Sequence, residues 1–391
     1  MKTITFFKHL SAFLAVIMVF GVIGVNASEM SVGAVDTSAS FNLECKSAIL
    51  MEASTGTVLY EQNADEALPP ASVTKIMTLL LVMEAVDSGA LNLDDLVSVS
   101  ANAASMGGSQ IYLEEGETMS VEEMLKSVII SSANDAAVAL AEHVAGSEQA
   151  FVQKMNDKAL ELGMENTYFE NTNGLDDSVT KHLTSARDIA IMSRELIKYE
   201  KILEYSSLWM DTIRNGTFGL TNTNRLVRFY NGATGLKTGS TAKAKFCVSA
   251  TAKRGNMHLI CVIMGAPTRD ERNAMASKLL DYGFANYSLF VSKGQKLDEI
   301  KVVGGVDDSC GASSSEYSVV VKKGEEGRVA TEFEIQERLT APVKIGDTVG
   351  RMVYKLGDKI IGENKISATE SIEKIKYTEL LKRFVEKVLI K

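Results

Sequence analysis

The sequence predicts a mixed α/β domain, followed by a small all-β module and a C-terminal amphipathic helix. Two observations indicate this class. Strand-like segments lie at both ends of residues 42–292 and enclose a helical middle, so one sheet is assembled from distant parts of the chain. After Val291-Ser292-Lys293-Gly294 the pattern changes to short β-type runs separated by turns that contain glycine.

The composition is that of an ordinary globular protein. Of its 391 residues, 46% are hydrophobic and 23% are charged, which excludes disordered and fibrous classes. The formal net charge of −9 offers little to the phosphate backbone, so nucleic acid is not expected as a partner. The four cysteines form no Cys-x-x-Cys pair and the four histidines no His-Glu-x-x-His motif. The sequence therefore indicates no metal site, no cofactor and no disulfide scaffold.

Residues 1–27 resemble a cleavable export signal. Lysines and an apolar run over Leu10–Val25 precede Val25-Asn26-Ala27, a pattern of small residues that signal peptidases cut. The run is shorter than the roughly 20 apolar residues of a typical membrane span, so a signal peptide is favoured over a retained anchor. The sequence predicts an exported, extracytoplasmic protein with a short linker over residues 28–41.

Within residues 42–292 the elements follow in order. Strands are predicted over Ser47–Met51 and Thr57–Glu61, which a glycine-containing turn joins. A long apolar helix is predicted over residues 70–86, because Pro69-Pro70 suits a first helical turn. The later elements are two helices between Val121 and Gly146 with a polar break at 131–135, helices over Ala150–Leu162 and Ser185–Tyr199, strands over 233–239, 245–252 and 257–264, and a helix over Glu271–Tyr287.

Residues 298–368 are predicted as the all-β module. The expected strands are Ser318–Val321, Glu332–Ile335, Val343–Ile345, Thr348–Tyr354 and Lys359–Ile361.

The tail, residues 370–391, is predicted as an amphipathic helix. Its apolar side carries Tyr377, Leu380, Leu381, Phe384, Val385, Val388 and Leu389, and charged residues take the other side. Such a helix suits a membrane interface. The alternative is a helix docked on its own protein or on a second copy.

The candidate nucleophile is Ser72 in Ser72-Val73-Thr74-Lys75. A serine and a lysine three residues apart share a helix face, so the amine of Lys75 can take the hydroxyl proton. The chain contains four Ser-x-x-Lys strings, and the one at Ser178 repeats the same four letters. Ser72 is favoured because it opens an apolar helix behind two prolines, where free backbone N–H groups favour negative charge. The alternative for Ser72 is an ordinary helix N-cap.

Two further motifs carry polar groups that suit catalysis. Ser132-Ala133-Asn134 occupies the polar break between two apolar helices, although the same letters recur at Ser100 and a helix cap is an alternative interpretation. Lys237-Thr238-Gly239 occurs once, at the end of a predicted strand. Its glycine lets a ligand approach the backbone, and its charge and hydroxyl suit an anionic group. The alternative is a solvated strand end.

In combination, the three motifs have the order found in penicillin-binding proteins and class A β-lactamases. The chain resembles the low-molecular-mass penicillin-binding proteins that act as serine-type D-alanyl-D-alanine carboxypeptidases. Further matching segments are Thr55-Gly56-Thr57-Val58-Leu59-Tyr60, Pro70-Ala71-Ser72, Asn173-Gly174-Leu175 and Thr184-Ser185-Ala186-Arg187-Asp188. The resemblance covers about residues 42–366. It implies a β-lactamase/transpeptidase-like domain over residues 42–292, with a mainly antiparallel sheet flanked by helices.

The resemblance implies an acyl-enzyme mechanism. Ser72 would attack the carbonyl between two terminal D-alanines of a peptidoglycan stem peptide, with Lys75 as general base. A free lysine has a pKa of about 10.4, so burial and a neighbouring cation, Lys237, must lower that of Lys75. Ser132 would relay a proton to the leaving amine, and Asn134 would hold a substrate amide.

The same resemblance implies the binding residues. Backbone N–H groups of Ser72 and Ser240 would form the oxyanion hole. Lys237, Thr238 and Arg272 would bind the terminal carboxylate, and Gly239 lies among them in the strand. The alternative for Arg272 is an exposed arginine on a helix surface.

The implied partners are peptidoglycan stem peptides ending in D-Ala-D-Ala, β-lactams as covalent inhibitors, and a membrane surface at the C-terminal helix. The oligomeric state is open. One rival is a class A β-lactamase, but the sequence lacks the expected Glu-x-x-Leu-Asn string. Another is a wall-binding protein without catalysis.

Two details of the predicted sheet bear on these expectations. Lys245 stands where members of the family often carry glycine, which puts substrate preference at that edge in doubt. Cys247 and Cys261 lie on adjacent predicted strands, where they could face each other, and are interpreted as buried thiols.

Overall fold

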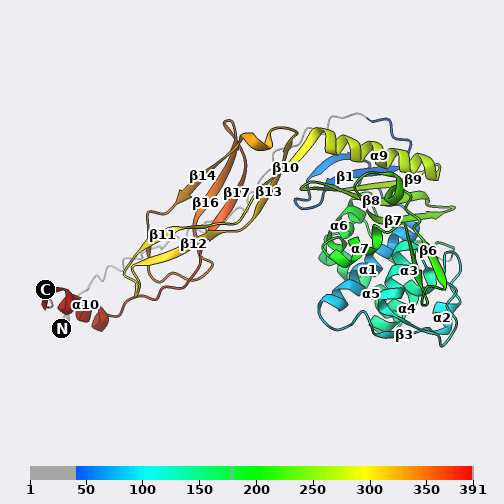
Figure 1. The fold of residues 1–391 in the computed structure, drawn as a ribbon, viewed down its shortest axis with the longest axis horizontal. Coiled ribbons are helices and arrows are strands. Elements are labelled where there is room, and N and C mark those ends of the chain that lie inside the picture. The colour runs from blue at the N-terminus through cyan, green and yellow to red at the C-terminus, as the bar shows by residue number, and fades with distance from the viewer. Residues whose placement is uncertain (1–40, 178, 390–391) are drawn as a thin grey trace, which may run out of the picture. The chain divides into compact units, whose positions relative to one another are not determined.

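The computed structural model describes residues 41–389 except Ser178, so the predicted signal peptide and nearly all of the 28–41 linker lie outside the described residues. A five-stranded sheet in the order β2-β1-β9-β8-β7 forms the centre of the first domain (Figure 1). All four pairings are antiparallel. The strands are β1 (Ser47–Glu52), β2 (Val58–Gln62), β7 (Ala233–Thr241), β8 (Lys245–Arg254) and β9 (Met257–Ala266). The predicted α/β class is confirmed.

Helices cover both faces of this sheet (Figure 1). One face carries α9 (Arg269–Asn286). The other faces a helical layer made of α1 (Lys75–Asp87), α3 (Val121–Ile130), α4 (Asn134–Ala145), α5 (Glu148–Glu161), α6 (Ala186–Leu196) and α7 (Glu200–Ser206). Shorter elements complete the domain: the 3₁₀ turn η1 (Ala71–Thr74), α2 (Ala101–Ala104), α8 (Leu226–Phe229), and the pairs β3 (Leu96–Ser98) with β4 (Thr118–Ser120) and β5 (Met210–Ile213) with β6 (Phe218–Thr221).

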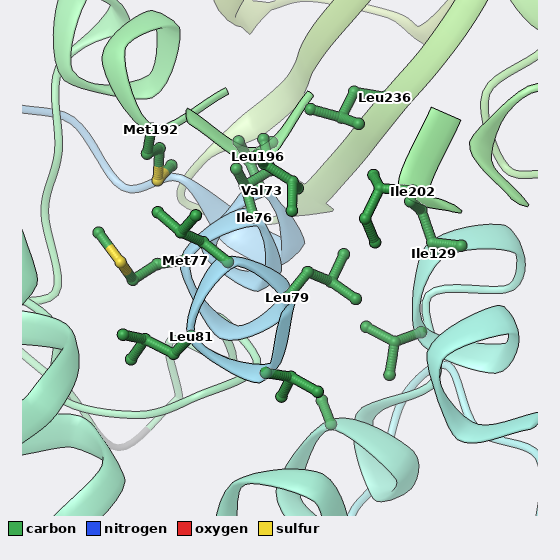
Figure 2. Close-up of a cluster of buried hydrophobic side chains, with 14 of the residues drawn as sticks. Val73, Ile76, Met77, Leu79, Leu81, Ile129, Met192, Leu196, Ile202 and Leu236 are labelled. Carbon is green, nitrogen blue, oxygen red and sulfur yellow. The ribbon is translucent and has the colours of Figure 1, made fainter. Parts of the chain in front are cut away.

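The sheet separates two apolar cores. Alternate side chains of a strand point to opposite faces, so Ile49 packs toward the helical layer while Leu50 packs toward α9. Other elements enclose helix α1, so all of its residues from Lys75 to Met83 are buried. Figure 2 shows its Ile76, Met77 and Leu79 among side chains from neighbouring helices and from β7. These side chains are fully buried, which anchors the start of α1 firmly.

The second domain is all-β, as predicted. Its six-stranded sheet has the order β14-β16-β17-β12-β11-β15, with one parallel pair, β11 and β15. The strands are β11 (Lys296–Val303), β12 (Ser309–Ser314), β14 (Val329–Ile335), β15 (Arg338–Thr340), β16 (Thr348–Leu356) and β17 (Lys359–Ala368), and a separate pair joins β10 (Tyr287–Ser292) to β13 (Tyr317–Lys322). A core of its own includes Met352, Tyr354 and Ile366.

One predicted strand of this domain is wrong. Val343–Ile345 makes only a single bridge, between Val343 and Ile372. The chain turns there, because the Lys344 amide donates to a carboxylate oxygen of Asp347 at 2.8 Å and Gly346 takes a left-handed φ of 87°. Because the chain turns here, residues 343–345 are too short an extended segment to form a ladder of strand hydrogen bonds.

Helix α10 (Tyr377–Leu389) forms within the predicted tail. Its apolar side chains are exposed: Tyr377 by 79%, Leu380 by 52% and Phe384 by 64%. In the part of the chain that the structure describes, no helix combines the length and apolar character needed to cross a bilayer.

Candidate active site

Ser72 lies in the 3₁₀ turn η1, directly before α1. The predicted helix over residues 70–86 is present, but its first turn is 3₁₀ and regular α-helix begins only at Lys75. Ala71 has a left-handed φ of 50°. The turn packs against a loop at Gly174, where a methyl group would lie 1.9 Å from the Ala71 carbonyl oxygen. Ser72 is not the N-cap of α1, a position that Thr74 takes, so the capping alternative is wrong too.

The side chain of Lys75 forms a hydrogen bond with the candidate nucleophile, Ser72. Its Nζ lies 2.9 Å from Ser72 Oγ and also donates to Asn134 Oδ1 at 2.6 Å and to the Asn173 carbonyl at 2.8 Å. The side chain is fully buried. Burial and the charge of Lys237 lower the pKa of Lys75 well below its ordinary value. A neutral amine in this position can accept the proton of Ser72.

The break between α3 and α4 places Ser132 and Asn134 beside the two lysines. Ser132 has a left-handed φ of 64°, and its Oγ accepts from Lys237 Nζ at 2.8 Å. Asn134 is the first residue of α4 rather than its cap, and its Nδ2 donates to the Gly107 carbonyl at 2.6 Å. Its carbonyl oxygen holds the amine of Lys75. The interpretation of these residues as simple caps is therefore wrong.

Strand β7 brings the third motif to the nucleophile. Lys237 is buried, and desolvation together with the nearby charge of Arg272 lowers its pKa to about 7. Gly239 is required by close packing, because a methyl group there would lie 2.8 Å from both the Pro70 carbonyl oxygen and the Ser72 amide. The motif is not a solvated strand end.

Arg272 projects from α9 and is 2% exposed, so the alternative of an exposed helix arginine is wrong. Its Nη1 donates to the Cys247 carbonyl at 3.3 Å, and two further nitrogens contact Asn273 Oδ1. Burial lowers its pKa to about 10. The guanidinium is thus fixed and charged at the site.

A cavity of about 620 Å³ joins these groups. Of the predicted residues, its wall contains Ser72, Ser132, Thr238, Gly239, Ser240 and Arg272. Lys75, Asn134 and Lys237 are tied to that wall by the hydrogen bonds given above. The structure therefore brings together every site residue that the motifs suggested.

The sequence reasoning missed the rest of the wall. These residues are Ser109, Trp209, Thr221, Asn222, Thr223, Arg225, Arg228, Phe229 and Arg269. They lie on short elements and loops without a periodic pattern or a motif, so no local signal marks them. Among the described residues, no group of three or more His, Cys, Asp or Glu side chains is placed to hold a metal.

The structure also shows the conformation of Lys245 and the surroundings of Cys247 and Cys261 in the sheet. Lys245 has a left-handed φ of 58°, the conformation that glycine adopts most easily. Cys247 and Cys261 are free, buried thiols that belong to the two different cores.

Comparison with known proteins identifies the family. The family described as D-alanyl-D-alanine carboxypeptidase matches residues 34–268, and the C-terminal domain of penicillin-binding protein 5 matches residues 286–374. This chain belongs to the D-alanyl-D-alanine carboxypeptidases. It is 46% identical over 347 residues to D-alanyl-D-alanine carboxypeptidase DacF of Bacillus subtilis, covering 87% of this chain and 89% of the relative. Identity to DacC of Escherichia coli is 34%, with 85% of each chain covered.

Solved structures give the same family. Penicillin-binding protein 5 from Haemophilus influenzae superposes with a TM-score of 0.76 at 30% identity, covering 86% of this chain and 99% of that one. The predicted function, a serine-type D-Ala-D-Ala carboxypeptidase of the penicillin-binding type, is confirmed. Membership of this family implies peptidoglycan stem peptides as substrate, β-lactam binding and action outside the cytoplasm.

Proposed function

We propose that this carboxypeptidase removes the terminal D-alanine from pentapeptide stems through an acyl-enzyme on Ser72. The observation that carries the proposal is the 2.9 Å contact between Lys75 Nζ and Ser72 Oγ at the wall of an open cavity. Lys75 takes the hydroxyl proton as Oγ attacks the carbonyl of the penultimate D-alanine. The tetrahedral intermediate then expels the amine of the last residue. Water hydrolyses the resulting ester and regenerates Ser72.

The leaving amine needs a proton, and Ser132 is placed to deliver one. Its hydroxyl accepts from Lys237 Nζ at 2.8 Å, so it can pass its own proton to the amine while Lys237 replaces it. Because the pKa of Lys237 is lowered to about 7, its ammonium group can give up a proton near neutral pH. Ser132 and Lys237 thus form the acid side of the site, opposite the base Lys75.

The tetrahedral oxyanion is bound by the backbone amides of Ser72 and Ser240. Support comes from the close approach of β7 to η1, at the position where Gly239 lies beside the Ser72 amide. A donor of this kind typically contributes about 2.7–4 kcal/mol to the transition state. The substrate carboxylate lies against Thr238 and the fixed guanidinium of Arg272, both of which line the cavity.

The test is intact-protein mass spectrometry after brief exposure to penicillin, combined with an assay of D-alanine release. Wild type gains one penicilloyl group and releases D-alanine, and Ser72→Ala does neither. Ser178→Ala, which alters the same Ser-Val-Thr-Lys letters elsewhere, is the matched control and behaves as wild type. An adduct on Ser72→Ala would refute the assignment. Rapid penicillin turnover would favour a β-lactamase, and wall binding without acylation would favour a binding protein.

We further propose that α10 holds the enzyme at the outer face of the cytoplasmic membrane. Tyr377, Leu380, Leu381, Phe384 and Val385 are all exposed, from 42% to 79%. An exposed apolar face on a strongly amphipathic helix suits the boundary between headgroups and acyl chains. Residues 369–391 carry six basic and four acidic side chains, so the attraction to anionic lipid is weak.

Flotation with vesicles of phosphatidylethanolamine and phosphatidylglycerol tests the membrane proposal. The chain from residue 28 onward, without the predicted signal peptide, floats with the vesicles, and Phe384→Glu reduces the bound fraction severalfold. Phe333→Glu is the matched control, because Phe333 is also exposed, by 46%, but lies on β14. Concentration-dependent dimers in sedimentation velocity, lost with Phe384→Glu and without vesicle binding, would show instead that a second copy covers the helix.

A further inference from the structure

The cavity continues past the residues that bind the substrate carboxylate. Thr238 Oγ1 donates to Thr223 Oγ1 at 2.9 Å, and the segment over residues 221–229 forms the wall beyond it. On α9, Arg269 lies one helical turn before Arg272 and lines the same space. A stem peptide ends at its terminal carboxylate. With the carboxylate at Thr238 and Arg272 as proposed above, this part of the cavity lies on the leaving-group side of the scissile bond, where the D-Ala-D-Ala main chain has no further atoms.

This extension is lined by arginines without carboxylate partners. Arg225, Arg228 and Arg269 are exposed, and none of them forms an ion pair within residues 41–389. Elsewhere in the chain, arginines such as Arg187 are paired with acidic side chains. Positive charges gathered in one cavity of a chain whose net charge is −9 favour the binding of an anionic ligand there.

The three arginines line one cavity, and two of them lie near enough to Arg272 to affect its charge. Arg269 and Arg225 both contribute, by like-charge repulsion, to the lowered pKa of Arg272, after the larger effect of burial, while the nearby carboxylate of Asp270 acts in the opposite direction. Arg228 is held by two aromatic rings, since its guanidinium carbon lies 5.2 Å from the centre of the Trp209 ring and 5.4 Å from that of Phe229. Stacking of this kind reduces the entropy that the side chain loses on binding a carboxylate.

We propose that Arg225, Arg228 and Arg269 form a leaving-group subsite that recognises a second carboxylate. Its ligands are D-amino acids with an acidic side chain. Their α-carboxylate lies at Thr238 and Arg272, as for D-alanine, and the side-chain carboxylate reaches the arginine cluster. Neutral D-amino acids of the same size bind only through the first of these contacts. The inference rests on the proposed acyl-enzyme at Ser72.

Such an amino acid also acts in the reverse direction, as an attacking amine. Its neutral amine adds to the carbonyl of the Ser72 ester, a C–N bond forms, and the C–O bond to Ser72 breaks. Ser132 takes the proton that the amine loses and passes its own proton to the neutral amine of Lys237, while Lys75 returns a proton to Ser72 Oγ, so no other reactant is needed. The product is a stem peptide in which the acidic D-amino acid replaces the last D-alanine.

The test is a competition between D-glutamate and D-glutamine, which share shape and differ in charge. The enzyme from residue 28 onward, without the predicted signal peptide, is incubated with a diacetyl-L-Lys-D-Ala-D-Ala donor and equal concentrations of both amino acids. Mass spectrometry then gives the ratio of the two exchange products. We expect D-glutamate to be favoured about tenfold at low salt and less at high salt, as charge-assisted contacts require. A ratio near one for wild type would overturn the proposal.

Substitutions in the arginine cluster test whether these arginines cause the preference for D-glutamate. Arg228→Gln and the double variant with Arg225→Gln should bring the product ratio toward one. Arg254→Gln is the matched control, because Arg254 also stacks on two aromatic rings, Tyr230 and Phe284, and does not line the cavity. Because the readout is a ratio, a change in overall turnover does not imitate the result. An unchanged ratio in folded Arg228→Gln and double-variant proteins would also overturn the proposal.

Trp209, the only tryptophan in the chain, provides a readout without catalysis. In the Ser72→Ala protein, D-glutamate should change its fluorescence at a lower concentration than D-glutamine. Equal titrations would refute the subsite even if exchange occurs. Failure of the acyl-enzyme proposal is distinguishable, because Ser72→Ala would then still release D-alanine from the donor or gain a penicilloyl group.

Discussion

Replacing Gly239 by alanine tests how closely β7 must approach the nucleophile. A methyl group at this position would lie 2.8 Å from the Pro70 carbonyl oxygen, 2.8 Å from the Ser72 amide and 2.9 Å from the Val73 amide. All three are backbone atoms, and they belong to a turn anchored in the core. To reach the 3.4 Å of ordinary contact, β7 must move away by about 0.6 Å. That movement separates Ser240 from Ser72 and widens the proposed oxyanion hole.

The expected loss in acylation rate is between about 10-fold and 100-fold, since a misplacement of about 1 Å costs about 100-fold. The assay is the second-order rate constant for labelling by a fluorescent penicillin, with Tm measured in parallel. Gly219→Ala is the matched control, because Gly219 also lies in a strand, has no positive φ and has no atom within 4 Å of the added methyl group. A folded Gly239→Ala protein that acylates within threefold of wild type would refute the reasoning.

Three further predictions follow from single side chains. Lys237→Gln removes one of the two causes that lower the pKa of Lys75, so the rising limb of the pH profile of acylation moves to higher pH, and an unmoved limb would contradict this. Lys245→Gly removes a left-handed φ that costs a lysine about 1–2 kcal/mol, whereas the greater backbone freedom of glycine in the unfolded chain costs only ~0.5–1 kcal/mol. The variant should therefore be slightly more stable, and its Tm in calorimetry should rise by about 1–3 °C rather than fall. Burial lowers the pKa of His182 to about 4 from 6.5, so its stabilising contribution is present above pH 6.5 and is lost as pH falls toward 4. Urea unfolding from pH 7 to 4.5 measures this loss, about 3 kcal/mol when complete, and His182→Gln should show a shallower decline.

The motifs predicted the catalytic centre because its chemistry requires particular residue types at fixed spacing. Ser72 and Lys75 must share one helical face, and a strand must bring Lys237 to the break that holds Ser132. The turn at Ser72 was not predictable. Its 3₁₀ form depends on Gly174, which packs against Ala71 from a distant loop.

Other features escaped prediction because local propensity does not mark them. Strand β12 is rich in serine and glycine, which are poor strand formers, yet Cys310, Ala312 and Ser314 alternate toward the core of the second domain. The arginine wall of the cavity has no periodicity at all, and only tertiary packing brings Arg225 and Arg269 to Arg272. Prediction therefore reached the residues near Ser72 and stopped short of the outer wall of the cavity.

The position of β1 constrains how the molecule can fold. This early strand lies between β2 and β9, and its Leu50 pairs with Cys261 from much later in the chain. Neither core can close before β9 joins the sheet, since both faces of β1 depend on that partner. Contacts so distant in sequence slow folding, and a chain truncated before residue 257 should remain sensitive to protease and bind no penicillin. The nucleophile therefore becomes functional only after nearly the whole catalytic domain has been synthesised.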